Sequence, residues 1–95
     1  MDVSYLAFGE RLVRVHRFRY MRPLGCAFTT NDILIEEALG HVSDESQRCM
    51  ARPDHPELVI RPEFVAYGES VEAAVKACIE RIRPRRVHEL FLPKG

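Results

Sequence analysis

Hydrophobic and polar positions between residues 68 and 83 follow the period of an α-helix. The apolar positions fall at offsets 0, 3, 4, 7, 8 and 11, and they are Val71, Ala74, Val75, Cys78, Ile79 and Ile82. Ser70 stands where a helix N-cap is expected, and Pro84 follows where the pattern ends. The pattern predicts an amphipathic helix that needs an apolar layer beneath it.

A second stretch of apolar residues predicts another helix, beginning after Thr30 or Asn31 and ending between Leu39 and Val42. Its apolar positions fall at offsets 0, 1, 4, 5 and 8, and they are Leu34, Ile35, Ala38, Leu39 and Val42. Asp32 would lie in the first turn, where a negative charge is favourable. Gly40 would close the helix.

The remaining apolar segments predict strands. Residues 11–21 are rich in Val, Phe and Tyr, but Val13 and Val15 differ in parity from Phe18 and Tyr20, so we expect a bulge near His16 or Arg17. Residues 22–25 then form a turn. Residues 57–61 and 64–67 flank Pro62, and residues 87–92 form a closing strand.

A polar segment at residues 43–56 is predicted to be the longest loop, with a short strand at 49–51, and a loop of this length is a place to look for function. The order of elements is then strand, helix, one or two strands, helix, strand, because the segments around Pro62 fit either two short strands or one kinked strand. If Pro62 separates two strands, this order predicts a single α+β domain over residues 1–95 with a ferredoxin-like βαββαβ arrangement, in which two helices cover one face of an antiparallel sheet.

The composition fits one small globular domain. The chain has 95 residues, of which 46% are hydrophobic and 29% charged, and residues 1–8 lack the basic start of a secretory signal. We therefore expect a soluble cytoplasmic protein. Of the three cysteines, Cys78 is expected to be buried, whereas Cys49 lies in a polar segment and is the thiol to test for reactivity.

Charge is unevenly distributed along this neutral chain. Basic and acidic residues number five and two in residues 1–29, three and ten in residues 30–72, and six and two in residues 73–95. Such a distribution indicates either attraction between segments within the fold or separate basic and acidic faces for partners.

Arginines and aromatic residues alternate in the first predicted strand. The candidate binding residues for an anion or nucleic acid are Arg14, Arg17, Arg19, Arg22, Phe18 and Tyr20. Because a strand has two faces, these arginines are expected to divide between them, and some are expected to pair with the acidic middle of the chain.

Metal-binding and catalytic patterns are weak in comparison. His41, Asp44, Cys49 and His55 are the one group of metal-ligand residue types, but no pair has the spacing of a helix-borne site or a zinc knuckle. We expect no metal and no cofactor. No nucleophile elbow, paired catalytic carboxylates or glycine-rich phosphate loop is present, so no catalytic residue is assigned.

Three short stretches resemble the acylphosphatase family. Residues 12–16 are similar to its first strand, residues 39–44 to its Gly-Trp-Val-Arg-Asn turn, and residues 68–72 to the start of its second helix. The resemblance implies a βαββαβ fold. The glycines of the family's phosphate loop are missing from residues 17–25, Gly25 stands in place of the catalytic arginine, and Asp44 replaces the asparagine that orients water. These departures argue against the family's activity.

A second resemblance is to HicB-like antitoxins. Residues 60–64 followed by residues 68–74 are similar to their strand, proline turn and Gly-x-Ser/Thr-x-x-x-Ala helix entry. The resemblance implies a regulator that neutralises a small RNase by direct contact.

Together these patterns favour a small non-enzymatic binding or regulatory module. Its expected partner is a protein, with a homodimer formed through the sheet or an edge strand as one form of this; no contact with membrane is expected. Two alternatives stay open. One is an acylphosphatase-like hydrolase of small phosphorylated substrates that uses Arg17, Arg19 or Arg22, and the other is a nucleic-acid-binding or HicB-like regulator.

Overall fold

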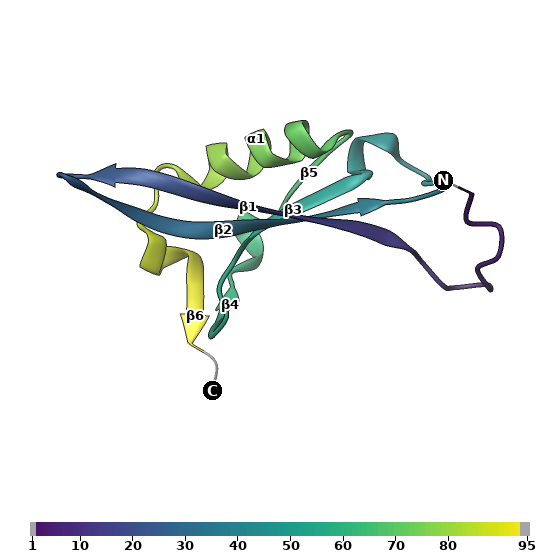
Figure 1. Cartoon of the computed structure of the whole chain (residues 1–95), viewed down its shortest axis with the longest axis horizontal. Helices are drawn as coiled ribbons and strands as arrows, with labels where there is room; N and C mark the ends of the chain where they lie inside the picture. The colour runs from purple at the N-terminus through teal and green to yellow at the C-terminus, as the bar shows by residue number, and fades with distance from the viewer. Residues whose placement is uncertain (1, 94–95) are drawn as a thin grey trace.

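The computed structural model describes residues 2–93 and consists mainly of antiparallel strands (Figure 1). The main sheet has the strand order β1-β2-β3-β5, and a separate ribbon pairs β4 with β6. The elements are β1 (Val13–Leu24), β2 (Ala27–Ala38), η1 (Glu45–Gln47), β3 (Cys49–Asp54), β4 (Leu58–Ile60), η2 (Pro62–Phe64), β5 (Ala66–Gly68), α1 (Val71–Ile82), η3 (Val87–Leu90) and β6 (Phe91–Pro93).

The predicted ferredoxin-like βαββαβ arrangement is wrong. α1 is the one α-helix among residues 2–93, and the segment expected to form the first helix is the long strand β2. Asn31, Ile33 and Ile35 are buried in alternation, which is the period of a strand with one covered face. A short apolar run such as residues 33–35 fits both periods, and the β-branched residues within it favour a strand.

Strand β1 is present as predicted but without the expected bulge. It pairs with β2 in an uninterrupted register from Val13 opposite Ala38 to Leu24 opposite Ala27. The predicted turn therefore lies further along the chain, and Gly25 occupies it with a φ of +63°. The apolar pattern changes from odd to even positions because apolar residues are exposed on both faces of β1, for example Val15 on one and Phe18 on the other. A bulge is not needed to explain it.

The predicted long loop contains a central strand. β3 lies between β2 and β5, so residues 49–54 are part of the sheet and only residues 39–48 connect it to β2. The two strands expected around Pro62 are present as β4 and β5, but they belong to different sheets. The predicted closing strand begins instead with η3, and only β6 is extended.

The helix α1 is confirmed together with its cap. The Ser70 hydroxyl accepts a hydrogen bond from the Ala73 amide at 3.1 Å. α1 packs on β5, β3 and β2, and the core beneath it contains Ile33, Ile35, Cys49, Ala51, Phe64, Ala66, Ala74, Cys78, Ile82, Leu90 and Phe91. The predicted apolar layer beneath the helix is thus a sheet.

The main sheet therefore has two different faces. We call the face beneath α1 the helix-side face and the opposite one the outer face; on β1, Phe18 and Tyr20 belong to the first and Arg17 and Arg19 to the second. Strand β1 forms an edge of the sheet, and the β1–β2 hairpin extends beyond the end of α1 (Figure 1). The molecule is 50 Å long, and the hairpin tip lies at one end of this longest axis (Figure 1).

Candidate interaction surface on the edge strand

The outer edge of β1 presents main-chain groups that pair with no strand among residues 2–93. The Leu39 amide donates to the Leu12 carbonyl at 3.1 Å, so even-numbered residues of β1 direct their N–H and C=O groups at β2. The odd-numbered residues direct theirs away from the sheet. The free donors belong to Val13, Val15, Arg17, Arg19 and Met21. A row of such groups is a template for another strand.

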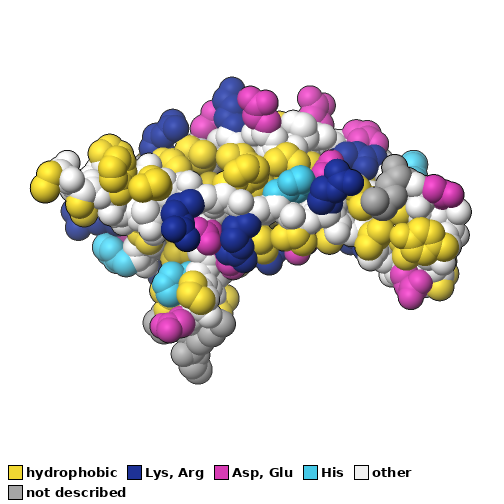
Figure 2. Space-filling view, in the orientation of Figure 1, with side chains coloured by type: hydrophobic (Ala, Val, Ile, Leu, Met, Phe, Trp, Pro, Cys, Tyr) yellow, Lys and Arg dark blue, Asp and Glu magenta, His cyan; other side chains and the backbone are white. Residues whose placement is uncertain are grey.

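On the helix-side face, an apolar groove separates β1 from the helix. Phe18 forms one wall, and Val71 and Val75 of α1 form the other, around a hollow of about 390 Å³. Phe18 is 46% exposed, because α1 lies over β2, β3 and β5 and leaves the edge strand uncovered. Figure 2 shows hydrophobic side chains in a band below the helix. The groove can accept an aliphatic or aromatic side chain.

On the outer face, two of the predicted arginines are paired with the acidic middle of the chain. Arg17 Nη1 donates to Asp54 at 2.8 Å and to Asp32 at 3.1 Å, and Arg19 Nε donates to Asp32 at 3.3 Å. These bonds connect β1, β2 and β3 across the face. Arg17 and Arg19 keep 52% and 69% of their side-chain area exposed, so their other donors face solvent.

This network shifts the ionisation of its members. The hydrogen bonds from Arg17 and then from Arg19 hold the pKa of Asp32 below its usual value, against a smaller opposing effect of burial. The carboxylates of Asp54 and Asp32 raise the pKa of Arg17. Both charged forms are therefore favoured, and Asp32 stays ionised at neutral pH.

The other predicted site residues lie on the helix-side face, and they have different surroundings. Arg22 Nη1 donates to the carbonyls of Ile82, Arg83 and Arg85 at the end of α1, and its guanidinium lies 5.4 Å from the Tyr20 ring centroid. Arg14 is exposed and has no ion pair within residues 2–93. The six predicted residues thus do not form one site, and Arg22 fixes the hairpin to the helix end.

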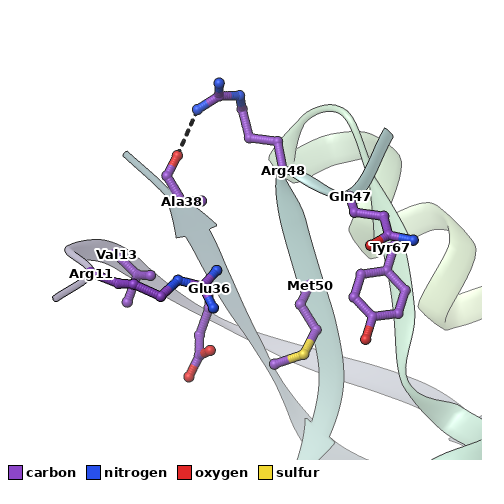
Figure 3. Close-up of a pocket in the computed structure, with 8 residues that line it drawn as sticks. All are labelled: Arg11, Val13, Glu36, Ala38, Gln47, Arg48, Met50 and Tyr67. Carbon is purple, nitrogen blue, oxygen red and sulfur yellow. Dashed lines mark hydrogen bonds between the residues drawn. The ribbon is translucent and has the colours of Figure 1, made fainter. Parts of the chain in front are cut away.

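A second hollow lies on the outer face near the start of β1 and has a volume of about 490 Å³. Figure 3 shows Met50 and Tyr67 near each other on one side of it, with Glu36 and Arg11 on the other. Arg48 donates to the Ala38 carbonyl at 2.7 Å and closes the upper end. A long side chain on a strand added beside Val13 could reach this hollow.

Apolar residues are exposed at the tip of the β1–β2 hairpin. Met21, Leu24 and Phe28 are 51%, 67% and 59% exposed. Figure 2 shows this apolar cluster at the end of the molecule. Large exposed apolar side chains gathered at one place are typical of a surface that contacts another molecule.

Cys49, the thiol that the sequence selects for a test of reactivity, is fully buried on β3. Burial raises the pKa of Cys49, and it raises the pKa of Cys78 to about 11. The exposed thiol is that of Cys26, in the hairpin turn. Within residues 2–93 no group of His, Cys, Asp or Glu side chains could hold a metal ion. In the same part of the chain no helix is long and apolar enough to cross a membrane.

Comparisons of the chain with family models, with curated proteins and with solved structures found no match.

Sequence reasoning selected β1 for its arginines and missed its main-chain edge. Whether β1 lies at the edge of the sheet depends on which strands pair, and this pairing cannot be worked out unless β2 is recognised as a strand. One signal was available: large apolar residues at both parities, such as Val15, Phe18 and Met21, cannot all face one core.

Proposed function

We propose that this protein is a non-enzymatic binding module whose edge strand β1 pairs with an extended acidic segment of another protein. The observation that carries the proposal is the 12-residue edge strand, whose outward main-chain groups pair with no strand within residues 2–93 and whose neighbours include exposed apolar side chains. Strand addition gains affinity from main-chain hydrogen bonds and specificity from the side chains that alternate on either side.

The positive charge of β1 favours an acidic partner. Strand β1 carries Arg14, Arg17, Arg19 and Arg22 and no acidic residue. A second copy added at the same edge would place two basic strands side by side, and charged edge residues are a common means of preventing such self-pairing. The same arginines attract carboxylates, and Arg19 still has its terminal nitrogens free of hydrogen bonds within residues 2–93. An acidic partner therefore fits better than a homodimer.

The two faces of β1 indicate the pattern of the added strand. Side chains on its outer face would meet Arg17 and Arg19, which favour carboxylates. Side chains on its helix-side face would meet Phe18 and Tyr20, which favour aliphatic groups. A segment alternating acidic and aliphatic residues satisfies both faces at once.

The alternatives that depended on the arginines have less support. Both the nucleic-acid hypothesis and the hydrolase hypothesis need free guanidinium groups that converge on one anion. Arg17 and Arg19 are held by Asp32 and Asp54, and Arg22 is held by carbonyl oxygens at the end of α1.

A synthetic peptide of 12 residues, alternating glutamate and valine and matching β1 in length, tests the proposal. We expect saturable binding in fluorescence anisotropy, at least about tenfold weaker binding for the lysine and valine counterpart, and weaker binding as salt increases. Hydrogen exchange should slow at the amides of Val15, Arg17 and Arg19, whereas those of His16 and Phe18 should already be protected by β2.

Two variants separate strand addition from simple charge attraction. Val15→Pro removes an outward N–H and leaves the bonds to β2 in place, so it should weaken peptide binding strongly, whereas Val15→Ala should weaken it little. Equal binding by these two variants contradicts the proposal. The proposal is also contradicted if light scattering shows a dimer that becomes a monomer in Val15→Pro, because β1 would then pair with a second copy of the chain.

A further inference from the structure

A third cavity, separate from the edge of β1, lies between the hairpin tip and the segment after α1. It has a volume of about 840 Å³, within the range of sites for small organic ligands. The hairpin forms one side with Arg22 and Leu24, and residues 85–88 form the other. Figure 2 shows basic and histidine side chains in this region, between the tip and the projection at the foot of the view.

The charges around this cavity have one sign. Arg22, Arg85 and Arg86 line it, and none of the described residues that line it is acidic. Glu89 lies nearby, but its contact with Arg85 is long, 3.9 Å, and Arg85 is 58% exposed. Three guanidinium groups without a carboxylate among them favour an anion.

Histidines and an unsatisfied guanidinium add donors. The His55 Nδ1 accepts a hydrogen bond from the Glu57 amide at 3.0 Å, which assigns the proton of the neutral ring to Nε2. His88 also lines the cavity. Arg22 has Nε and Nη2 buried without an acceptor among the described residues, and a buried donor without a partner is costly.

Apart from Thr29, the rest of the lining is apolar. Leu24, Leu58 and Val87 come from three separate segments and surround the charged groups. An inorganic ion would leave these side chains in contact with water, whereas a ligand with an apolar body would cover them. The cavity therefore matches a ligand with two different parts.

We propose that this cavity binds an amphipathic organic anion, in which a carboxylate or phosphate is attached to an aliphatic or aromatic body. Arg85 and Arg86 bind the anionic group, and Leu58 and Val87 contact the body. The site does not depend on strand addition at β1, since Val13, Val15 and the other outward groups lie outside it.

The test uses the fluorescent anion 8-anilinonaphthalene-1-sulfonate as a probe. We expect saturable binding at one site by the wild-type protein, and much weaker binding of uncharged N-phenyl-1-naphthylamine. The double variant Arg85→Gln and Arg86→Gln should lose at least about tenfold in affinity for the anion. The matched double variant Lys76→Gln and Arg83→Gln removes the same charge outside the cavity and should bind as the wild type does.

Two further measurements complete the test. When the probe binds, the NMR chemical shifts of the backbone amides should change most at Thr29, Leu58 and Val87. Changes confined to these residues would exclude adsorption of the probe to partly unfolded protein. Competition with octanoate and with phenyl phosphate then distinguishes a carboxylate ligand from a phosphate ligand. Equal loss of affinity in both double variants, shifts confined to other surfaces, or displacement by neither competitor would overturn the proposal.

Discussion

The carboxylate of Asp32 accepts hydrogen bonds from Arg17 at 3.1 Å and from Arg19 at 3.3 Å, and so connects β2 to the edge strand. Because these bonds lower the pKa of Asp32 in the folded state, its ionisation stabilises the fold above the pKa of the unfolded chain. That stabilisation is lost as the pH falls through the lowered folded pKa.

Asp32→Asn should therefore reduce the free energy of unfolding at pH 7 by about 1 kcal/mol, the upper end for a partly exposed ion pair. The difference from the wild type should shrink as the pH falls below about 4, where Asp32 becomes protonated in the unfolded chain. Urea unfolding at several pH values measures it. Glu80→Gln, a change at an exposed helix residue, is the control and should show no such trend. A constant difference at all pH values contradicts the prediction.

Gly68 is expected to tolerate no side chain, although its backbone is not left-handed. A Cβ at this position would lie 2.5 Å from the Ala74 amide nitrogen and 2.8 Å from the Ala73 carbonyl carbon. Backbone atoms cannot move away as a flexible side chain can. Gly68→Ala should therefore destabilise the fold by about 2 kcal/mol or more, since α1 must shift from β5.

Thermal and urea unfolding measure this effect, and Glu69→Ala is a matched control at the next, exposed position. If Gly68→Ala is as stable as Glu69→Ala, α1 does not approach β5 as closely as the structure has it.

The three thiols should differ sharply in reactivity. Cys49 and Cys78 are fully buried, and burial raises the pKa of Cys78 to about 11, so neither forms thiolate readily at neutral pH. Cys26 is exposed in the hairpin turn. An aromatic disulfide reagent at pH 8 should thus react quickly with one thiol in the native protein and with all three in denaturant.

Cys26→Ser provides the check on this assignment, because it should abolish the fast phase and leave the slow phases unchanged. Fast reaction that persists in Cys26→Ser would mean that β3 or α1 opens readily.

The sequence allowed α1 to be predicted almost residue by residue, because its apolar positions cover several turns and a cap precedes them. It did not allow β2 to be recognised as a strand, because the spacing of Leu34 and Ala38 fits a helix, whereas the spacing of Ile33 and Ile35 fits a strand. Long-range pairing of β2 with β1 and β3 decides between the two. The arginines of β1 are visible in the sequence, but Asp54, a partner of Arg17, lies on β3, and the sequence predicts a loop at that position.

Arg48 closes the end of β2, and its geometry requires a guanidinium group. Its Nη1 donates to the Ala38 carbonyl at 2.7 Å, its Nη2 to the Gly40 carbonyl at 3.0 Å, and its Nε and Nη2 to Glu45 at 2.7 Å. Lysine keeps the charge but cannot reach these acceptors simultaneously from one planar group.

Arg48→Lys should therefore lower the free energy of unfolding nearly as much as Arg48→Gln does, because carbonyl acceptors at the end of β2 lose their donors in both. Glu45→Gln, which removes only the exposed ion pair, should lower it less than either. Chemical unfolding of the three variants gives the order. If Arg48→Lys is as stable as the wild type, then charge alone holds Arg48 beside Glu45, and the bonds to Ala38 and Gly40 contribute nothing to closing the strand.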